Sequence, residues 1–212
     1  MTTVGAPIVL HRFLAPDDFA ALQQNVLTLS ETERSYIPLH KKGGTIAYGT
    51  IRARAPAVAE FYHSRAHRGA VSDLLGLWLE PTPLRDESSL SILVYEHSGD
   101  HIGWHFDHNF YRGRHFTVLL AIENRGFCRD GLSASCLMAR SGRTEQIVPT
   151  PANTLVVFEG ARVLHKVTPI REGERRVILS MTYCTDPRNS LTREVARRFK
   201  DTAFFGMRAL WS

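Results

Sequence analysis

The chain has 212 residues, of which 43% are hydrophobic and 22% are charged, and its formal net charge is +5. This length and composition predict one domain over residues 1–212 with a single sizeable core. The three cysteines form no Cys-x-x-Cys motif, the first residues lack the pattern of a secretory signal, and no apolar run reaches membrane-spanning length. These features argue against a disulfide framework, a zinc knuckle and a membrane protein, and they predict a cytoplasmic location.

Residues 1–88 are predicted to be rich in helix. Pro16, Asp17 and Asp18 suit a first helical turn, where proline and acidic side chains meet unpaired backbone N–H groups. Apolar residues then recur at helical spacing and give this helix a buried face. The elements expected in this part are a strand over 8–13, a helix from Pro16, a loop over 35–50 that leads into a strand near 45–51, two helices within 55–79 that are separated near 67–69, and a turn region over 81–87.

Residues 89–185 have the sequence pattern of a β-sheet protein. Eight short runs rich in β-branched and aromatic residues are separated by Gly, Asn and Pro. Such a series is typical of a double-sheet jelly roll, and helices that precede it would pack on one sheet. We therefore expect an α+β fold with a double-stranded β-helix core. Residues 186–212 are predicted to form a helix over 191–200 and an apolar tail that packs on the body.

The stretch over 93–109 carries the strongest chemical signal. His105 and Asp107 are two residues apart, so in a strand both side chains would point to the same face. Two histidines and one carboxylate on one side of an ion form the ligand set of mononuclear iron(II) sites. We expect the second histidine to be His165, which follows a predicted strand and a Glu-Gly turn. The alternative for His105 is a buried histidine that is bonded to Asp107 and holds no metal.

Two motifs resemble a known family. They are Y-E-H-S-G-D-H-I-G-W-H-F-D over 95–107 and H-K-V-T-P-I-R-E-G-E-R over 165–175. With them the chain resembles the iron(II)/2-oxoglutarate-dependent dioxygenases of the prolyl-hydroxylase type, over about residues 89–185. The resemblance implies that His105, Asp107 and His165 bind iron(II). It further implies that Arg175 binds the distal carboxylate of 2-oxoglutarate and that Tyr95 hydrogen-bonds this cosubstrate.

Arg175 and its neighbour Arg176 compete for the 2-oxoglutarate carboxylate. A buried carboxylate needs a charged partner, and the planar guanidinium can bind it with two hydrogen bonds. If Arg175 points inward, the apolar Val177, Leu179 and Met181 do so too, and this pattern favours Arg175. The other register would place Arg176 inside, with the hydroxyl groups of Ser180 and Thr182.

The resemblance predicts a hydroxylase that consumes O2 and acts on a C–H bond of a small molecule, either a free amino acid or a natural-product intermediate. Because Asp107 is present, we expect oxygen insertion, whereas related halogenases lack this carboxylate. Asn109 and Arg114, just past the metal motif, are expected at the substrate opening. One alternative is an enzyme that acts on a protein residue or an alkylated base, supported only by the basic residues within 188–200. The other alternative is a non-enzymatic β-barrel binding module.

Overall fold

The computed structural model describes residues 5–29, 33–37, 41–83, 86–142 and 144–188. The helix and tail predicted within 186–212 thus lie almost entirely outside the described residues. The helices are α1 (Pro16–Leu27), α2 (Tyr48–Arg54), α3 (Pro56–His63) and α4 (Arg65–Leu75). The strands are β1 (Ile8–His11), β2 (Glu33–Ile37), β3 (Lys41–Ile46), β4 (Glu80–Pro81), β5 (Leu90–Tyr95), β6 (His101–His105), β7 (His115–Arg125), β8 (Leu137–Ser141), β9 (Thr144–Val148), β10 (Thr154–Phe158), β11 (Leu164–Val167) and β12 (Arg175–Cys184).

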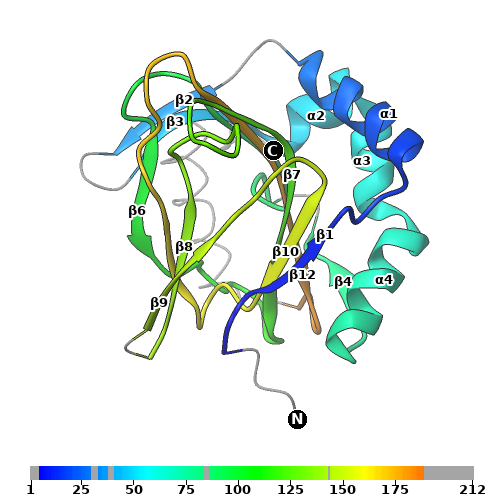
Figure 1. Cartoon of the computed structure of the whole chain (residues 1–212). Helices are drawn as coiled ribbons and strands as arrows, with labels where there is room; N and C mark the ends of the chain where they lie inside the picture. Colours follow the sequence, from blue (N-terminus) through cyan, green and yellow to red (C-terminus); the bar gives the residue numbers. More distant parts are fainter. Residues whose placement is uncertain (1–4, 30–32, 38–40, 84–85, 143, 189–212) are drawn as a thin grey trace.

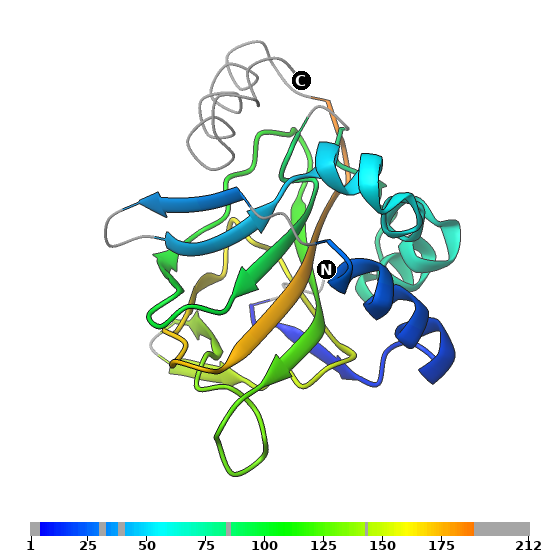
Figure 2. The same cartoon turned by 90° about the horizontal axis from the view of Figure 1, so that it is seen from above.

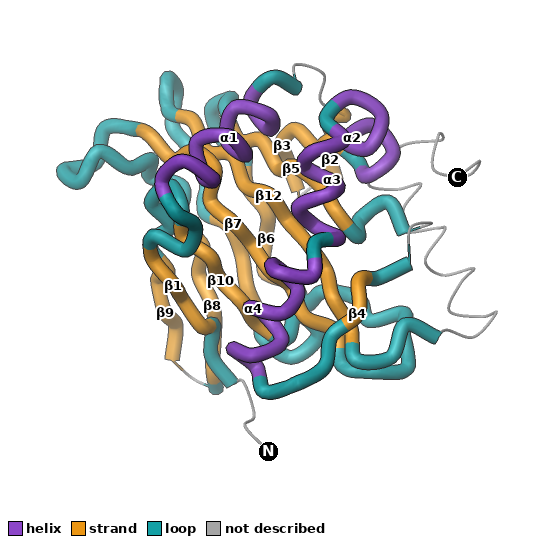
Figure 3. The backbone as a smooth tube through the Cα atoms, turned by 90° about the vertical axis from the view of Figure 1, so that its right-hand side faces the viewer, coloured by secondary structure: helices purple, strands orange, loops and turns teal. Residues whose placement is uncertain are grey.

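The strands form one antiparallel sheet that curls into a nearly closed barrel (Figure 1). Its order is β1-β10-β7-β12-β5-β3-β6-β11-β8-β9, with β2 paired to β3 and β4 paired to β12. The eight strands predicted between residues 89 and 185 correspond to β5 through β12, so the jelly-roll prediction is confirmed. Figure 3 shows α1, α3 and α4 lying across one face of the sheet, over β7 and β12, as expected for an α+β domain.

The sheet separates two apolar clusters. The outer cluster packs the helices against one face of the strands, and Leu120 and Leu179 belong to it. The inner cluster lies inside the barrel, and the next residues along the same strands, Leu119 and Ile178, belong to it. Alternate side chains of β7 and β12 thus enter opposite clusters, and both faces of these two strands are buried.

The helix predicted from Pro16 is confirmed as α1, with Asp17 and Asp18 in its first turn. Two helices also lie within 55–79, but they separate at Ser64 and not near 67–69. The Ser64 hydroxyl accepts a hydrogen bond from the backbone N–H of His67 and so caps the N-terminus of α4. None of the helices in the described part of the chain is long and apolar enough to cross a membrane.

Two further predictions in the N-terminal part are wrong. The loop expected over 35–50 is a hairpin of β2 and β3, and the strand expected near 45–51 ends at Ile46. Figure 2 shows this hairpin extending from the barrel on the side opposite the helices. The helix α2 follows at once, because the Glu87 carboxylate accepts a hydrogen bond from the Gly49 N–H at the helix N-terminus. This contact spans 38 residues, so local sequence does not reveal it.

Candidate metal centre

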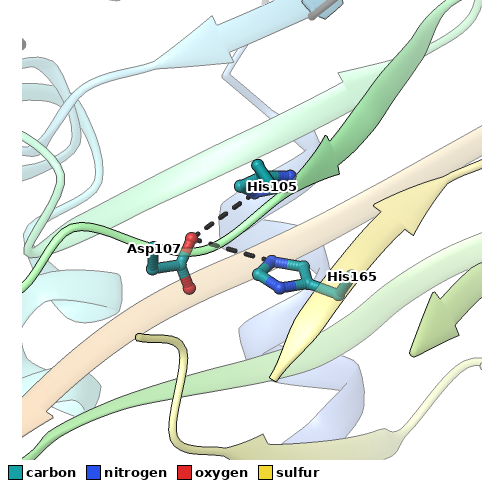
Figure 4. A group of neighbouring side chains, drawn as sticks. All are labelled: His105, Asp107 and His165. Carbon is teal, nitrogen blue, oxygen red and sulfur yellow. Dashed lines mark ion pairs between the residues drawn. The ribbon is translucent and has the colours of Figure 1, made fainter. Parts of the chain in front are cut away.

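His105 and His165 face each other from neighbouring strands. They are direct partners in the antiparallel register of β6 and β11, and their ring centroids are 4.1 Å apart. Figure 4 shows both imidazoles directed toward the carboxylate of Asp107. The Oδ1 atom of Asp107 lies 3.4 Å from Nε2 of His105 and 3.6 Å from Nε2 of His165. The pairing of β6 with β11, and the segment that follows the end of β6 at His105, therefore bring together the three side chains that the sequence singled out.

Backbone carbonyls orient both imidazoles. Nδ1 of His105 lies 2.9 Å from the Gly103 carbonyl oxygen, and Nδ1 of His165 lies 2.9 Å from the Val163 carbonyl oxygen. A carbonyl only accepts, so each neutral ring carries its proton on Nδ1 and turns the Nε2 lone pair toward Asp107. Such outer hydrogen bonds are the usual means by which proteins orient histidine ligands.

The Asp107 carboxylate is held from the other side. Thr117 of β7 donates a 2.5 Å hydrogen bond to its Oδ2 atom, and the Asp107 N–H donates to the Gly160 carbonyl oxygen at 3.0 Å. A methyl group on Gly160 would collide with Oδ2 of Asp107 and with the Thr117 hydroxyl. Only a residue without a side chain leaves the carboxylate in this place, so Gly160 and Thr117 together turn Oδ1 toward the histidines.

The protonation states suit cation binding. Burial raises the pKa of Asp107, but the charges and hydrogen bonds of the two histidines and Thr117 outweigh burial and hold this pKa well below its usual range. Burial lowers the pKa of His165. Burial also acts to lower the pKa of His105, but the hydrogen bond and charge of Asp107 raise it above its ordinary value. Above that pKa the site presents one anionic oxygen and two neutral nitrogens, the forms that bind a metal ion.

The donor set fits iron(II). His105, Asp107 and His165 each offer one ligand atom, and these atoms lie within 4.8 Å of one another. Two imidazole nitrogens and one carboxylate oxygen on one side of an ion leave the opposite positions open for other ligands. A structural zinc site would instead be closed by a fourth protein ligand. No fourth His, Cys, Asp or Glu joins this group within the described ranges.

A cavity of about 200 Å³ opens beside the three ligand side chains. Arg176 projects into it from β12 and is only 1% exposed, with its guanidinium carbon 5.3 Å from the centroid of the Tyr95 ring. Its contact with the Thr150 hydroxyl is long, at 3.5 Å, and its Nε atom has no hydrogen-bond partner. No carboxylate of the described residues forms an ion pair with it. A buried guanidinium that has no carboxylate partner favours the binding of an anionic ligand.

Tyr95, which the sequence predicted to bind the cosubstrate, stands beside the Arg176 guanidinium and lines the same cavity. Burial raises the pKa of Tyr95 to about 12, although the Arg176 charge acts in the opposite direction. The buried Tyr95 hydroxyl has no hydrogen-bond partner among the described residues. A neutral phenol that lacks a partner in a cavity wall can donate to a ligand oxygen.

The preference for Arg175 as the inward-facing arginine is wrong. Its guanidinium points away from the cavity and lies 3.8 Å from Glu96 and 3.4 Å from Glu123. Val177, Leu179 and Met181, which share its face of β12, pack against the helices. The inward face carries the other set, Arg176, Ile178, Ser180 and Thr182.

The arrangement of strands matches solved structures. A prolyl hydroxylase from Trichoplax adhaerens, in complex with a hypoxia-inducible-factor peptide, has a TM-score of 0.65 at 15% identity, over 86% of this chain and 84% of that one. A 2OG-Fe(II) oxygenase-family oxidoreductase from Burkholderia pseudomallei has a TM-score of 0.67 at 13% identity, over 88% of each chain. The fold is that of the iron(II)/2-oxoglutarate-dependent oxygenases.

A Pseudomonas putida prolyl-4-hydroxylase shares this oxygenase fold, with a TM-score of 0.61 and 20% identity over 85% of this chain and 92% of that one. No protein-family model matches the sequence, and no curated protein is significantly similar to it. At these identities the comparison concerns the fold. The roles of individual residues in this chain therefore depend on its own geometry.

The two residues predicted at the substrate opening do not line the cavity of the oxygenase fold. The Asn109 side chain instead closes its own loop, because it donates to the Gly113 carbonyl and accepts from the Tyr111 N–H. Arg114 forms an ion pair with Glu159 at 2.8 Å. Both side chains hold the chain near the site, and neither forms part of the cavity wall.

Sequence reasoning missed several residues that do line the cavity. Lys41 enters it from β3, Ser91 from β5 and Thr117 from β7, and Phe106 stands half exposed at its edge. Lys41 lies in a segment predicted to be a loop, so its inward direction was not visible. Strand alternation could have placed Ser91, since Tyr95 lies four residues further along the same strand.

Proposed function

We propose that this protein is an iron(II)- and 2-oxoglutarate-dependent oxygenase that hydroxylates an unactivated C–H bond of a small molecule. One observation supports this most strongly. The Nε2 atoms of His105 and His165 converge on Oδ1 of Asp107 beside a cavity that also holds the buried guanidinium of Arg176. A metal ligand set and a cation for a dicarboxylate are therefore present in one enclosed site.

The three ligand side chains hold the metal on one side. His105 and His165 keep Nε2 unprotonated by donating Nδ1–H to backbone carbonyls, and Asp107 supplies a negative charge that offsets part of the iron charge. When bound, iron(II) supplies the oxidative decarboxylation of 2-oxoglutarate by O2 and the oxygenation of the substrate. The chain orients this chemistry toward the cavity.

Arg176 and Tyr95 are proposed to bind 2-oxoglutarate. The distal carboxylate of this molecule would accept two parallel hydrogen bonds from the Arg176 guanidinium and a further one from the Tyr95 hydroxyl. The surrounding wall is apolar and comes from Leu119, Leu137, Val167 and Ile178. In such surroundings a charged pair with satisfied hydrogen bonds fixes the orientation of the ligand.

Asp107 also bears on the outcome of the reaction. Its carboxylate would bind the metal where the related halogenases, which lack this carboxylate, bind halide, and Thr117 and Gly160 hold it in place. We therefore propose oxygen insertion and no chlorination. Detection of a chlorinated product from the unmodified protein with chloride present would contradict this.

The proposed substrate is a free amino acid or a natural-product intermediate. One structural neighbour is an ectoine hydroxylase from S. alaskensis solved with 5-hydroxyectoine, and another is a carbocyclase of nogalamycin biosynthesis. The competing substrate is a prolyl residue in a protein, because the Trichoplax adhaerens neighbour was solved with a peptide. The three cysteines are free thiols, which suits a reducing compartment such as the cytoplasm.

Succinate release tests the function. Protein loaded with iron(II), 2-oxoglutarate and O2 is screened with the common L-amino acids and with proline-containing peptides. We expect substrate-stimulated succinate from a free amino acid, and loss of this signal with a chelator and in the His105→Ala variant. Stimulation by the peptides alone would favour the protein substrate. Succinate that the chelator and the variant leave unchanged would contradict the function itself.

A further inference from the structure

The cavity continues past the metal ligands, on the side away from Arg176. Thr117, which donates to Asp107, is the direct partner of Thr182 in the register of β7 and β12. Thr182 lies near the end of β12, and Arg176 lies near its start. His115, where β7 begins, lies still further from Arg176 and also lines the cavity. The metal and Arg176 are proposed to hold 2-oxoglutarate, so this outer part of the cavity is left for the substrate.

Two polar side chains of the outer part have partners within the protein. The Asp86 carboxylate is 2% exposed and accepts a 2.6 Å hydrogen bond from the Tyr111 hydroxyl. It also accepts from the hydroxyl of Ser88 at 2.6 Å and from the N–H of the same residue at 3.1 Å. Asp86 and Ser88 therefore do not require a polar group of the substrate to complete their hydrogen bonds.

An exposed aromatic ring stands at the edge of this outer part. The large apolar side chains that are exposed among the described residues are Trp78, Phe106, Phe127 and Ile147. Of these only Phe106, which is 49% exposed, lines the cavity. It stands between His105 and Asp107 in the chain, and successive Cα atoms are about 3.8 Å apart, so the ring is attached one residue from each of two candidate metal ligands. A ligand that covers this ring removes apolar surface from water.

The position of Phe106 follows from the end of β6. The strand ends at His105, so the alternation that would turn the next side chain away from the barrel interior does not extend to Phe106. Its ring stands at the cavity edge instead. A molecule that approaches the metal through the outer part of the cavity therefore lies beside this ring.

We propose that Phe106 packs against an apolar side chain of the substrate and so determines specificity. This inference rests on the proposed function, because it requires the metal at His105 and Asp107 and 2-oxoglutarate at Arg176. An apolar side chain would cover the ring, whereas a polar side chain of the same shape would lose hydration there without a compensating hydrogen bond. Among the proposed substrates this favours amino acids with an apolar side chain over polar ones of similar shape.

Binding without turnover tests this inference. Protein loaded with 2-oxoglutarate and with zinc(II) in place of iron(II) is titrated calorimetrically with pairs of L-amino acids of similar shape. The pairs are leucine with asparagine, valine with threonine, and methionine with glutamine. We expect the apolar member of at least one pair to bind about tenfold more tightly than its polar partner. Equal binding within every pair, tighter binding of the polar members, or binding of none of these amino acids would overturn the inference.

Variants of Phe106 test the role of the ring itself. Phe106→Ala should reduce the apolar preference to within about threefold, and Phe106→Leu, which keeps an apolar side chain, should retain most of it. The affinities for zinc(II) and 2-oxoglutarate should stay within about twofold of the wild type, because the ring is a ligand of neither. A Phe106→Ala variant that keeps the full preference would overturn the assignment. Loss of zinc(II) from this variant would also overturn it, since the ring would then act by supporting the metal ligands.

Phe127→Ala is the matched control. Phe127 is 72% exposed and does not line the cavity, so this variant should keep the apolar preference of the wild type. Thermal unfolding shows whether each variant is folded, and Phe106→Leu provides the measurement if Phe106→Ala does not fold. A preference that falls equally in Phe127→Ala and Phe106→Ala would contradict a specific role of Phe106.

A failure of the proposed function gives a different result. If wild-type protein does not bind 2-oxoglutarate at all, the proposed function is wrong and the inference falls with it. If 2-oxoglutarate binds and the apolar amino acids are not preferred, only the inference is wrong.

Discussion

Thr117 donates a 2.5 Å hydrogen bond to Oδ2 of Asp107 from β7, a strand that pairs with neither β6 nor β11. The carboxylate that completes the candidate metal centre is therefore positioned from the opposite wall of the barrel. Gly160 makes this contact possible, since a Cβ atom there would occupy the place of the carboxylate. The orientation of Oδ1 toward the two histidines thus depends on residues that do not themselves reach the metal position.

The first prediction concerns Gly160. In Gly160→Ala the added methyl group must displace the Asp107 carboxylate or the Thr117 hydroxyl, and we expect the affinity for iron(II) to fall by about 10- to 100-fold. Anaerobic competition with a chelating dye measures this directly. Gly69→Ala, in α4 with open space around it, is the control and should bind iron(II) as the wild type does. Unchanged affinity in Gly160→Ala would show that Asp107 needs no such support.

The second prediction separates the two adjacent arginines. Arg176→Met should raise the 2-oxoglutarate concentration required for half-maximal succinate release by about a hundredfold, because it removes the charged partner of a buried carboxylate. Arg175→Met should change this requirement little, since the Arg175 side chain is about one-third exposed and pairs with Glu96 and Glu123 outside the cavity. The reverse order of effects would restore Arg175 as the residue that binds 2-oxoglutarate.

The third prediction concerns a histidine in the helix-side core. His67 packs against the Phe61 ring with centroids 4.4 Å apart, and neither of its ring nitrogens has a hydrogen-bond partner among the described residues. Burial lowers the pKa of His67 from 6.5 to about 4. The folded protein therefore keeps this imidazole neutral, whereas the unfolded chain takes up a proton below about pH 6.5.

The sign of the pH effect follows from this difference. The contribution of the neutral, buried His67 to the free energy of unfolding is fully present above about pH 6.5. It is lost as the pH falls toward 4, and the loss at pH 5 is about 2 kcal/mol. Urea unfolding at pH 8 and pH 5 measures the change in the free energy of unfolding. His67→Phe, which keeps an aromatic ring and removes the titration, should lose about 2 kcal/mol less than the wild type over this interval. Equal losses would mean that His67 is protonated in the folded state.

The sequence was most informative about the three candidate metal ligands. The prediction that the His105 and Asp107 side chains converge is confirmed, but β6 ends at His105, and Asp107 is held in place by Thr117 and Gly160 beyond the end of the strand. His165 came from a motif far along the chain, and the antiparallel pairing of β11 with β6 brings it opposite His105. Short-range periodicity cannot reveal that pairing, so only the motif indicated His165 as the second histidine ligand.

The prediction that Arg175 faces the cavity failed for a physical reason. The choice of Arg175 assumed that the more apolar face of β12 lines the cavity. Both faces of this strand are buried, and the apolar set packs under the helices while Arg176 and the hydroxyl groups face inward. Hydrophobic alternation does not decide the register of a strand that has no solvent face.

Long-range contacts account for the other differences. The β2–β3 hairpin contains lysines and glycines with weak strand preference, and it is ordered by pairing with β5 and β6. Lys41 is buried only because of that pairing. The sequence around it shows a polar segment and gives no sign of a cation inside the barrel.

The central claim is that His105, Asp107 and His165 bind one iron(II) ion that also binds 2-oxoglutarate. Its most direct measurement is the visible absorption of the protein after anaerobic addition of iron(II) and then 2-oxoglutarate. We expect a metal-to-ligand charge-transfer band that requires both additions, is absent in His105→Ala and disappears with a chelator. Wild-type protein that binds iron(II) and 2-oxoglutarate without developing this band, or a band that persists in His105→Ala, would contradict the claim.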